Sequence, residues 1–128
     1  MYRFTEERSR TILERDVAAQ PGYVRLALAT GDAGALAACR KFSKLCAEES
    51  ANRALVIAQS SGSNRLEIEN QIRVATGGLL RGFKLAVVAQ GSDATYVARI
   101  AEATAIRQNG KAKVFHSEHQ AAAWLLMR

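Results

Sequence analysis

The sequence has no long apolar run, only 1 proline and only 2 cysteines among its 128 residues. No segment approaches the roughly 20 apolar residues that a helix needs to cross a bilayer, so we expect no membrane span. The N-terminal segment 1–7 is too rich in charge to serve as a secretory signal. The scarcity of proline also argues against a disordered or linker-rich chain. We therefore expect a cytoplasmic protein that folds by itself.

The scarcity of cysteine argues against a disulfide framework and against a metal site. Cys39 and Cys46 lie seven residues apart in one predicted helix, which places their α-carbons about 10 Å apart, beyond disulfide reach. The only histidines, His116 and His119, lie far away in the sequence and share no ligand spacing with the cysteines. We expect two buried free thiols, no metal and no cofactor.

Aromatic residues make up only 6% of the chain, although its formal net charge is +6. An excess of Lys and Arg invites a nucleic-acid interpretation, because these side chains neutralise phosphates. Here the basic residues are scattered among acids, and the aromatic residues do not alternate with them as in a stacking surface for single strands. The pattern argues against a nucleic-acid partner and indicates a solvated positive surface.

From Tyr23 onward the chain contains a regular alternation of strand and helix patterns. We expect strands at 23–29, 54–58, 85–89 and 113–115, and helices at about 33–51, through Ile68 up to Gly77-Gly78, at about 94–108, and from Ser117 through Leu125. The run at 54–58 is apolar throughout, which is typical of a central strand buried on both faces. The order predicts a single-domain α/β fold over residues 1–128, with a mostly parallel sheet of about four or five strands covered by about four helices.

The segment 1–22 does not share this regularity. Tyr2 and Phe4 alternate as in a strand, whereas Ile12, Leu13 and Val17 fit either a strand or a helix. We predict an N-terminal edge strand or hairpin here, before the turn residues Pro21-Gly22.

Three polar loops stand directly before predicted helices. In an open parallel sheet, ligands bind at the carboxyl ends of the strands, near a switch in strand order. Backbone N–H groups at a helix start attract anions. The candidate phosphoacceptor or anion-binding loop comprises Ser60, Ser61, Gly62, Ser63 and Asn64, and the candidate pocket rim comprises Thr30, Asp32, Ser92 and Asp93. The alternative is that these residues are there as turn and cap residues only.

Familiar catalytic motifs are missing from the sequence. It contains no phosphate loop of the Gly-x-x-x-x-Gly-Lys-Ser/Thr type, no Gly-x-Gly-x-x-Gly after a strand and no Gly-x-Ser-x-Gly nucleophile elbow. His116 and His119 have only Glu118 as a neighbouring carboxylate, so we expect exposed or cap-side histidines rather than a general base. We predict no catalytic residue and a non-enzymatic role.

Four segments near the C-terminus are informative together. They read Lys84-Leu85-Ala86-Val87-Val88, Ala101-Glu102-Ala103, Val114-Phe115 and Ala122-Ala123-Trp124-Leu125. This succession resembles the STAS superfamily, named for sulfate transporters and anti-sigma-factor antagonists, and within it the bacterial SpoIIAA-like (STAS/SEC14-like) domains. The resemblance implies an α/β domain that acts as a regulatory or protein-interaction module.

The serine loop carries a second part of this resemblance. Anti-sigma-factor antagonists have a phosphorylatable serine in an Asp-Ser-Ser-Gly-like loop, and Gln59-Ser60-Ser61-Gly62 is similar to it. The resemblance implies that Ser60 or Ser61 is the phosphoacceptor. Two features depart from that pattern, because Gln59 stands in place of the acid and the loop follows the predicted strand without an intervening apolar segment.

Three hypotheses of function remain open at this point. A regulatory module, alone or as a homodimer, would bind a regulatory protein partner through the helix and loops at 60–72. A carrier would hold a small anionic or apolar ligand, such as a lipid, at the strand ends. An enzyme of another type would need a cluster of titratable groups in one cleft.

Overall fold

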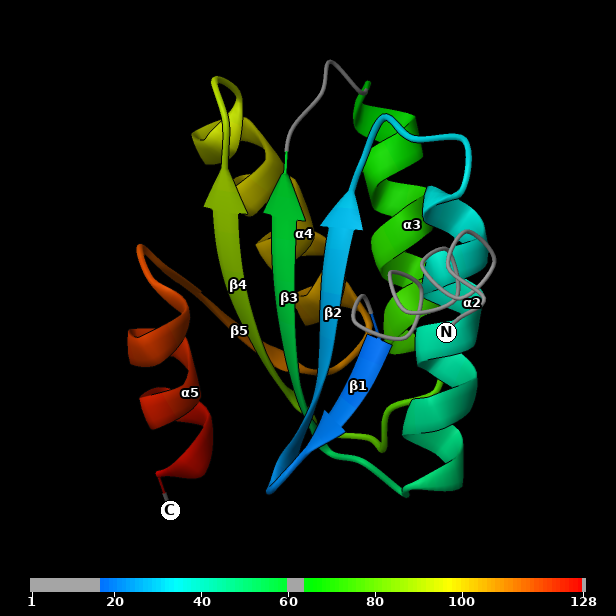
Figure 1. The fold of residues 1–128 in the computed structure, drawn as a ribbon, viewed down its shortest axis with the longest axis vertical. Helices are drawn as coiled ribbons and strands as arrows, with labels where there is room; N and C mark the ends of the chain where they lie inside the picture. Colours follow the sequence, from blue (N-terminus) through cyan, green and yellow to red (C-terminus); the bar gives the residue numbers. More distant parts are fainter. Residues whose placement is uncertain (1–16, 60–63, 128) are drawn as a thin grey trace, which may run out of the picture.

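A computed structural model describes residues 17–59 and 64–127 of the chain (Figure 1). The described strands are β1 (Val17–Gln20), β2 (Tyr23–Ala29), β3 (Arg53–Gln59), β4 (Lys84–Gln90) and β5 (Lys111–Phe115). The described helices are α2 (Ala35–Glu48), α3 (Arg65–Thr76), α4 (Ala94–Arg107) and α5 (Glu118–Leu126). The strands form a single sheet in which β2 to β5 run parallel and β1 runs antiparallel to β2. The predicted α/β class and mostly parallel sheet are confirmed.

The N-terminal hairpin prediction is confirmed for the residues that the structure describes. β1 pairs with the first half of β2, from Gln20 opposite Tyr23 to Val17 opposite Leu26. Gly22 has a φ of 93° in the turn between them, a backbone conformation that suits glycine. The predictions for Tyr2, Phe4, Ile12 and Leu13 lie outside the described residues.

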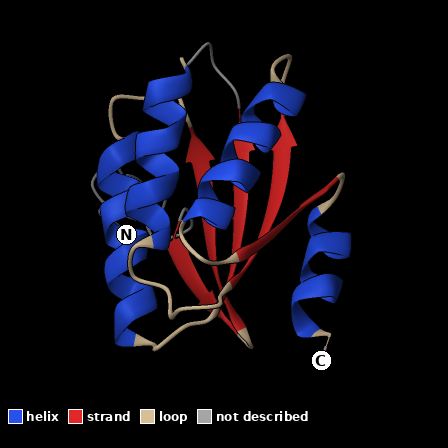
Figure 2. Ribbon diagram, turned by 180° about the vertical axis from the view of Figure 1, so that it is seen from behind, coloured by secondary structure: helices blue, strands red, loops and turns tan. Residues whose placement is uncertain are grey.

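The strand order explains the layers of the molecule. The strands lie in chain order, β1-β2-β3-β4-β5, so the sheet grows in one direction only. Connections between parallel strands are almost always right-handed, and a sheet that grows in one direction therefore places its crossover helices on one face. Figure 2 shows α2, α3 and α4 together on that face. The helix α5 is followed by no described strand, and it packs on the opposite face of the sheet, against β3, β4 and β5.

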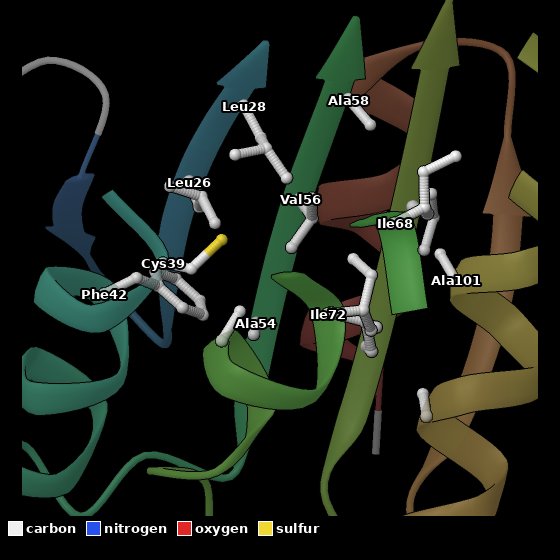
Figure 3. Close-up of a cluster of buried hydrophobic side chains, with 14 of the residues drawn as sticks. Leu26, Leu28, Cys39, Phe42, Ala54, Val56, Ala58, Ile68, Ile72 and Ala101 are labelled. Atoms are coloured by element: carbon white, nitrogen blue, oxygen red, sulfur yellow. The ribbon is translucent and has the colours of Figure 1, made fainter. Parts of the chain in front are cut away.

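The larger core lies between the sheet and α2, α3 and α4 (Figure 3). Alternate residues of β2 and β3 point into it, which matches the period of two in a pleated strand. Helical spacing brings the buried side chains of α2 and α3 onto the same region. The residues labelled in this cluster are Leu26, Leu28, Cys39, Phe42, Ala54, Val56, Ala58, Ile68, Ile72 and Ala101.

A smaller core lies under α5 on the other face of the sheet. Leu55 of β3 and Val88 of β4 meet Ala121 and Leu125 of α5 there, and all four are buried. Because β3 contributes buried residues to both cores, the prediction of a central strand buried on both faces is confirmed. 

A two-pronged contact holds the first turn of α5 to the sheet. Arg25 of β2 donates from Nε to Oε2 of Glu118 at 2.6 Å and from Nη2 to Oε1 at 3.2 Å. This bidentate geometry is the stronger form of an Arg–carboxylate pair. Glu118, the carboxylate beside the two histidines in the sequence, therefore serves to fix α5.

Several predicted boundaries differ from the observed ones. The helix expected at about 33–51 is α2, which begins at Ala35 and ends at Glu48. Two residues after its end, Ser50 adopts a left-handed φ of 49°. The strand expected at 113–115 is two residues longer, since Lys111 already pairs with Lys84. After α4, Asn109 takes the left-handed conformation, with φ 68°. Local signals locate an element, but tertiary pairing decides its last residues.

Candidate functional site

The three loops singled out in the sequence begin at the same edge of the sheet. They follow β2, β3 and β4, which are parallel and in register, with Ala29 opposite Gln59 and Gln59 opposite Gln90. Of the serine loop, Ser60, Ser61, Gly62 and Ser63 lie outside the described residues, and Asn64 lies at its end. The described strands lie in chain order, so no switch in strand order accompanies these loops in the described sheet.

Thr30 has a structural role at this edge. Its side chain is buried, and both its backbone N–H and its Oγ1 donate to the carbonyl oxygen of Gln59, at 3.1 and 3.3 Å. Gln71 of α3 donates from Nε2 to the carbonyl oxygen of Thr30 at 2.9 Å. These bonds join β2, β3 and α3. The buried Oε1 of Gln71 has no hydrogen-bond partner in the described part of the chain.

Asn64 caps α3 through a reciprocal pair of hydrogen bonds. The backbone N–H of Glu67 donates to Oδ1 of Asn64 at 2.9 Å, and the backbone N–H of Asn64 donates to Oε1 of Glu67 at 3.1 Å. This is a capping box, in which two otherwise unpaired backbone donors are satisfied. For Asn64 the structure therefore supports the cap interpretation. The helix predicted from Ser117 is also capped, since Oγ of Ser117 accepts from the backbone N–H of Gln120.

The other polar loop residues do not cap their helices. α2 begins after Gly34 and α4 after Asp93, and neither start has a side-chain cap hydrogen bond. Asp32 and Ser92 are exposed, and Asp93 is partly exposed. Helix capping explains the presence of Asn64, but the side chains of Asp32 and Asp93 cap no helix.

A hollow of about 540 Å³ lies beside the carboxyl end of β2. It begins where the described pairing of β1 with β2 ends, at Leu26. Its described lining is Ala27, Leu28, Ala29, Asp32, Gly34, Ala35, Ala38, Ile57, Gln59 and Gln90. Of the four predicted rim residues, Asp32 belongs to this lining, whereas Thr30, Ser92 and Asp93 do not. Most of the described lining residues are small and apolar, and the polar ones among them, Asp32, Gln59 and Gln90, lie at or just beyond the strand ends.

Neither the histidines nor the cysteines form a reactive centre. His116 and His119 are both exposed, as the sequence predicted. Cys39 and Cys46 are buried free thiols, which confirms the second expectation. Across residues 17–59 and 64–127, no group of three or more His, Cys, Asp or Glu side chains is placed to hold a metal ion.

Two exposed apolar residues at helix starts were not among the site residues predicted from the sequence. Leu66 in the first turn of α3 is 76% exposed, and Tyr96 in the first turn of α4 is 47% exposed. Both helices follow parallel strands, so both side chains lie at the carboxyl edge of the sheet. A signal was present, since Leu66 falls outside the stripe that Ile68 and Ile72 mark, and large apolar residues off the core stripe of a helix face solvent.

No family model, curated protein or solved structure matches this chain. In the described ranges, no helix is long and apolar enough to span a membrane.

Proposed function

We propose that this domain is a non-enzymatic regulatory or protein-interaction module of the STAS/SpoIIAA-like type. It binds a protein partner at the carboxyl edge of its sheet. The observation that carries the proposal is the pair of apolar side chains there, Leu66 and Tyr96, which are 76% and 47% exposed. Burying one such side chain in an interface stabilises it by about 1.5–3 kcal/mol, which suits an anchor for a partner.

The chemistry at this edge supports binding more than catalysis. The backbone N–H and the hydroxyl of Thr30 both donate to the carbonyl oxygen of Gln59. The side chain of Asn64 caps α3. Asp32 and Asp93 are the carboxylates of the loops after β2 and β4, and neither side chain makes a hydrogen bond or ion pair with another described residue. A general acid or base needs a positioned partner, which these groups lack there.

The sequence resemblance adds a regulatory element to the proposal. Ser60 and Ser61 lie six and five residues before Leu66 in the sequence. A phosphate on either serine would add a charge of about −1.5 to −2 within a few residues of the apolar anchor. Phosphorylation would thereby lower the affinity for a partner that buries Leu66, because burying a charge in an interface without a counterion costs free energy.

The first test compares two exposed leucines at opposite edges of the sheet. Leu66→Ser removes the proposed anchor, and we expect it to lower partner affinity about tenfold, since the loss of one buried leucine approaches 1.4 kcal/mol or more. The matched control is Leu80→Ser, because Leu80 is 49% exposed but lies just before β4, at the amino edge. The measurement is quantitative affinity capture from the native host, followed by titration of the captured protein.

The control decides the interpretation of that experiment. A partner lost with Leu66→Ser and retained with Leu80→Ser supports docking at the carboxyl edge. If both variants lose it equally, or if the unmodified domain captures nothing specific, the proposal fails.

A second candidate function is supported by the hollow beside β2. A volume of about 540 Å³ with a mostly apolar wall lies within the range of small-molecule sites. Asp32 is the charged group of its described lining, so the hollow suits an apolar ligand better than an anionic one. In this candidate function the domain is a carrier of a small apolar ligand.

The carrier function predicts stabilisation by a ligand that fits the hollow. Saturating medium-chain alcohols are expected to raise the Tm by about 5 °C, because a ligand that binds only the folded state stabilises it. Ala38→Leu would fill part of the hollow and abolish the shift, whereas Ala37→Leu, on the exposed side of α2, would leave it intact. Thermal unfolding checks this, and a shift that survives Ala38→Leu would place the ligand elsewhere.

A further inference from the structure

A groove between α3 and α4 brings together three arginines from two helices. Arg65 and Arg73 lie one helical turn on either side of Glu69, so the three residues form one stripe along α3. Arg107 belongs to the last turn of α4, which packs beside α3. The groove has a volume of about 340 Å³, and its lining consists of Arg65, Glu69, Arg73, Thr104, Arg107 and Gln108.

Glu69 holds two of these guanidinium groups in place. Its Oε2 accepts from Nε of Arg65 at 2.9 Å and lies 3.4 Å from Nη2 of Arg107. The Glu69 side chain is only 16% exposed, whereas those of Arg65 and Arg107 are 66% and 57% exposed. The hydrogen bond from Arg65, together with the nearby guanidinium charges, lowers the pKa of Glu69, which therefore stays ionised at neutral pH.

The groove keeps donors available to a ligand. Arg73 uses Nη1 on Oδ1 of Asn70 at 3.4 Å, and Arg107 uses Nη2 on both Glu69 and Oγ1 of Thr104. A guanidinium carries five N–H donors in a fixed fork, so each arginine retains donors beyond these contacts. Their exposure directs these remaining donors toward solvent and toward an incoming group.

The charges of the groove are unbalanced. Three guanidinium groups and one carboxylate leave a formal excess of two positive charges among the lining residues. A phosphate monoester carries a charge near −2 at neutral pH and three strong acceptor oxygens. Arginine forks match this geometry through bidentate hydrogen bonds, whereas a single carboxylate would compensate only half of the excess.

We propose that the groove between α3 and α4 binds the phosphate group of a phosphate monoester. Arg73 and Arg107 contact it from the two helices, and Glu69 positions Arg65 and Arg107 rather than contacting the ligand. The group belongs either to a small phosphorylated metabolite or to a phosphorylated side chain of another protein. This site lies in the helical layer and does not depend on the proposed docking at Leu66.

The test is an NMR titration of the full-length domain with inorganic phosphate at constant ionic strength and pH 7.5. We expect saturable shifts of backbone amides at Glu69 to Arg73 and at Thr104 to Gln108. In the double variant R73Q/R107Q, we expect the affinity to fall about tenfold or more, since each removes a charge-assisted hydrogen bond. Both side chains are exposed, so the fold is retained, which the spectrum itself verifies.

The matched control is R40Q/K44Q, which removes two exposed positive charges from α2. We expect the control to change the affinity less than twofold. Equal losses in the two double variants would show general attraction to a basic surface and overturn the proposal, as would the absence of any saturable shift.

Two further arms define the ligand. Lowering the pH to 5 converts free phosphoserine, used here in place of inorganic phosphate, largely from the dianion to the monoanion, because the second pKa of its phosphate is about 6, and we expect weaker binding. Sulfate keeps its two charges at that pH and retains its affinity. A phosphoserine peptide that binds more tightly than free phosphoserine would identify a protein as the source of the group, and equal affinities would identify a small metabolite.

Discussion

Replacing Gly78 by alanine is expected to destabilise the fold by about 3 kcal/mol, at the upper end of the usual cost of overpacking. A Cβ added at this position would lie 1.9 Å from the carbonyl oxygen of Ser43 and 2.7 Å from its carbonyl carbon. Both are backbone atoms of α2, which cannot turn aside as a side chain would. The segment after α3 would have to move away from α2, and contacts between the two helices would be lost.

The neighbouring glycine provides the control for this prediction. A Cβ at Gly77 would meet its nearest atom, the carbonyl oxygen of Val74, at 3.4 Å, and Gly77 has helical dihedrals of φ −62° and ψ −23°. Gly77→Ala is therefore expected to be neutral or to stabilise by about 0.5–1 kcal/mol, because it reduces the freedom of the unfolded chain. Urea unfolding measures both variants, and similar losses at the two positions would contradict the close approach to Ser43.

The second large effect concerns the reactivity of the two cysteines. Cys39 and Cys46 have no exposed surface, and burial raises the pKa of each thiol to about 12. The exposed thiolate is the nucleophile that attacks a thiol reagent, so a reaction at pH 8 requires opening of the core. We expect the folded domain to react at least about 1,000-fold more slowly than the unfolded chain, in keeping with the usual free energy of unfolding.

The measurement is the rate of thiol modification by Ellman's reagent in native buffer and in urea. Ala37→Cys, at an exposed position of the same helix, gives a control thiol that is expected to react rapidly in the folded domain. Native cysteines that react as rapidly as this control would contradict the burial of α2 against the sheet.

The raised thiol pKa also predicts a loss of stability in alkali. Each folded-state pKa, about 12, lies above the ordinary pKa of a free cysteine thiol, 9.0. The unfolded chain therefore releases these protons first, and their contribution to stability is complete below pH 9 and is lost as the pH rises from 9 towards 12. A variant with alanine at both cysteine positions is expected to lose less stability across that range.

Much of the fold could be predicted because its signals are local. The apolar run Ala54-Leu55-Val56-Ile57-Ala58 predicted a central strand, and β3 occupies that place. Ser117 and Gln120 predicted the start of α5, and the cap bond is present. The predicted end of α3 at Gly77-Gly78 is confirmed, although its contact with α2 could not be predicted from a turn signal.

The candidate site was less predictable. The sequence predicted parallel strands, and parallel strands place the three loops at one edge of the sheet. The parallel pairing of β2, β3 and β4 confirms this. The strand order was not predicted, since nothing local in the sequence specifies which strand pairs with which. The hollow therefore lies beside the end of β2, where Asp32 lines it and Thr30 is occupied in holding β3 and α3 together.

By itself, the sequence determined the class of fold, the approximate elements and the burial of both cysteines, because hydrophobic period and cap residues act over one or two turns of chain. Only the tertiary structure decided the strand order, the position of α5 on the second face and the meeting of Arg65, Arg73 and Arg107 across α3 and α4. These features depend on contacts between residues distant in sequence. Their choice is made by packing, strand pairing and the handedness of the connections, which no local pattern encodes.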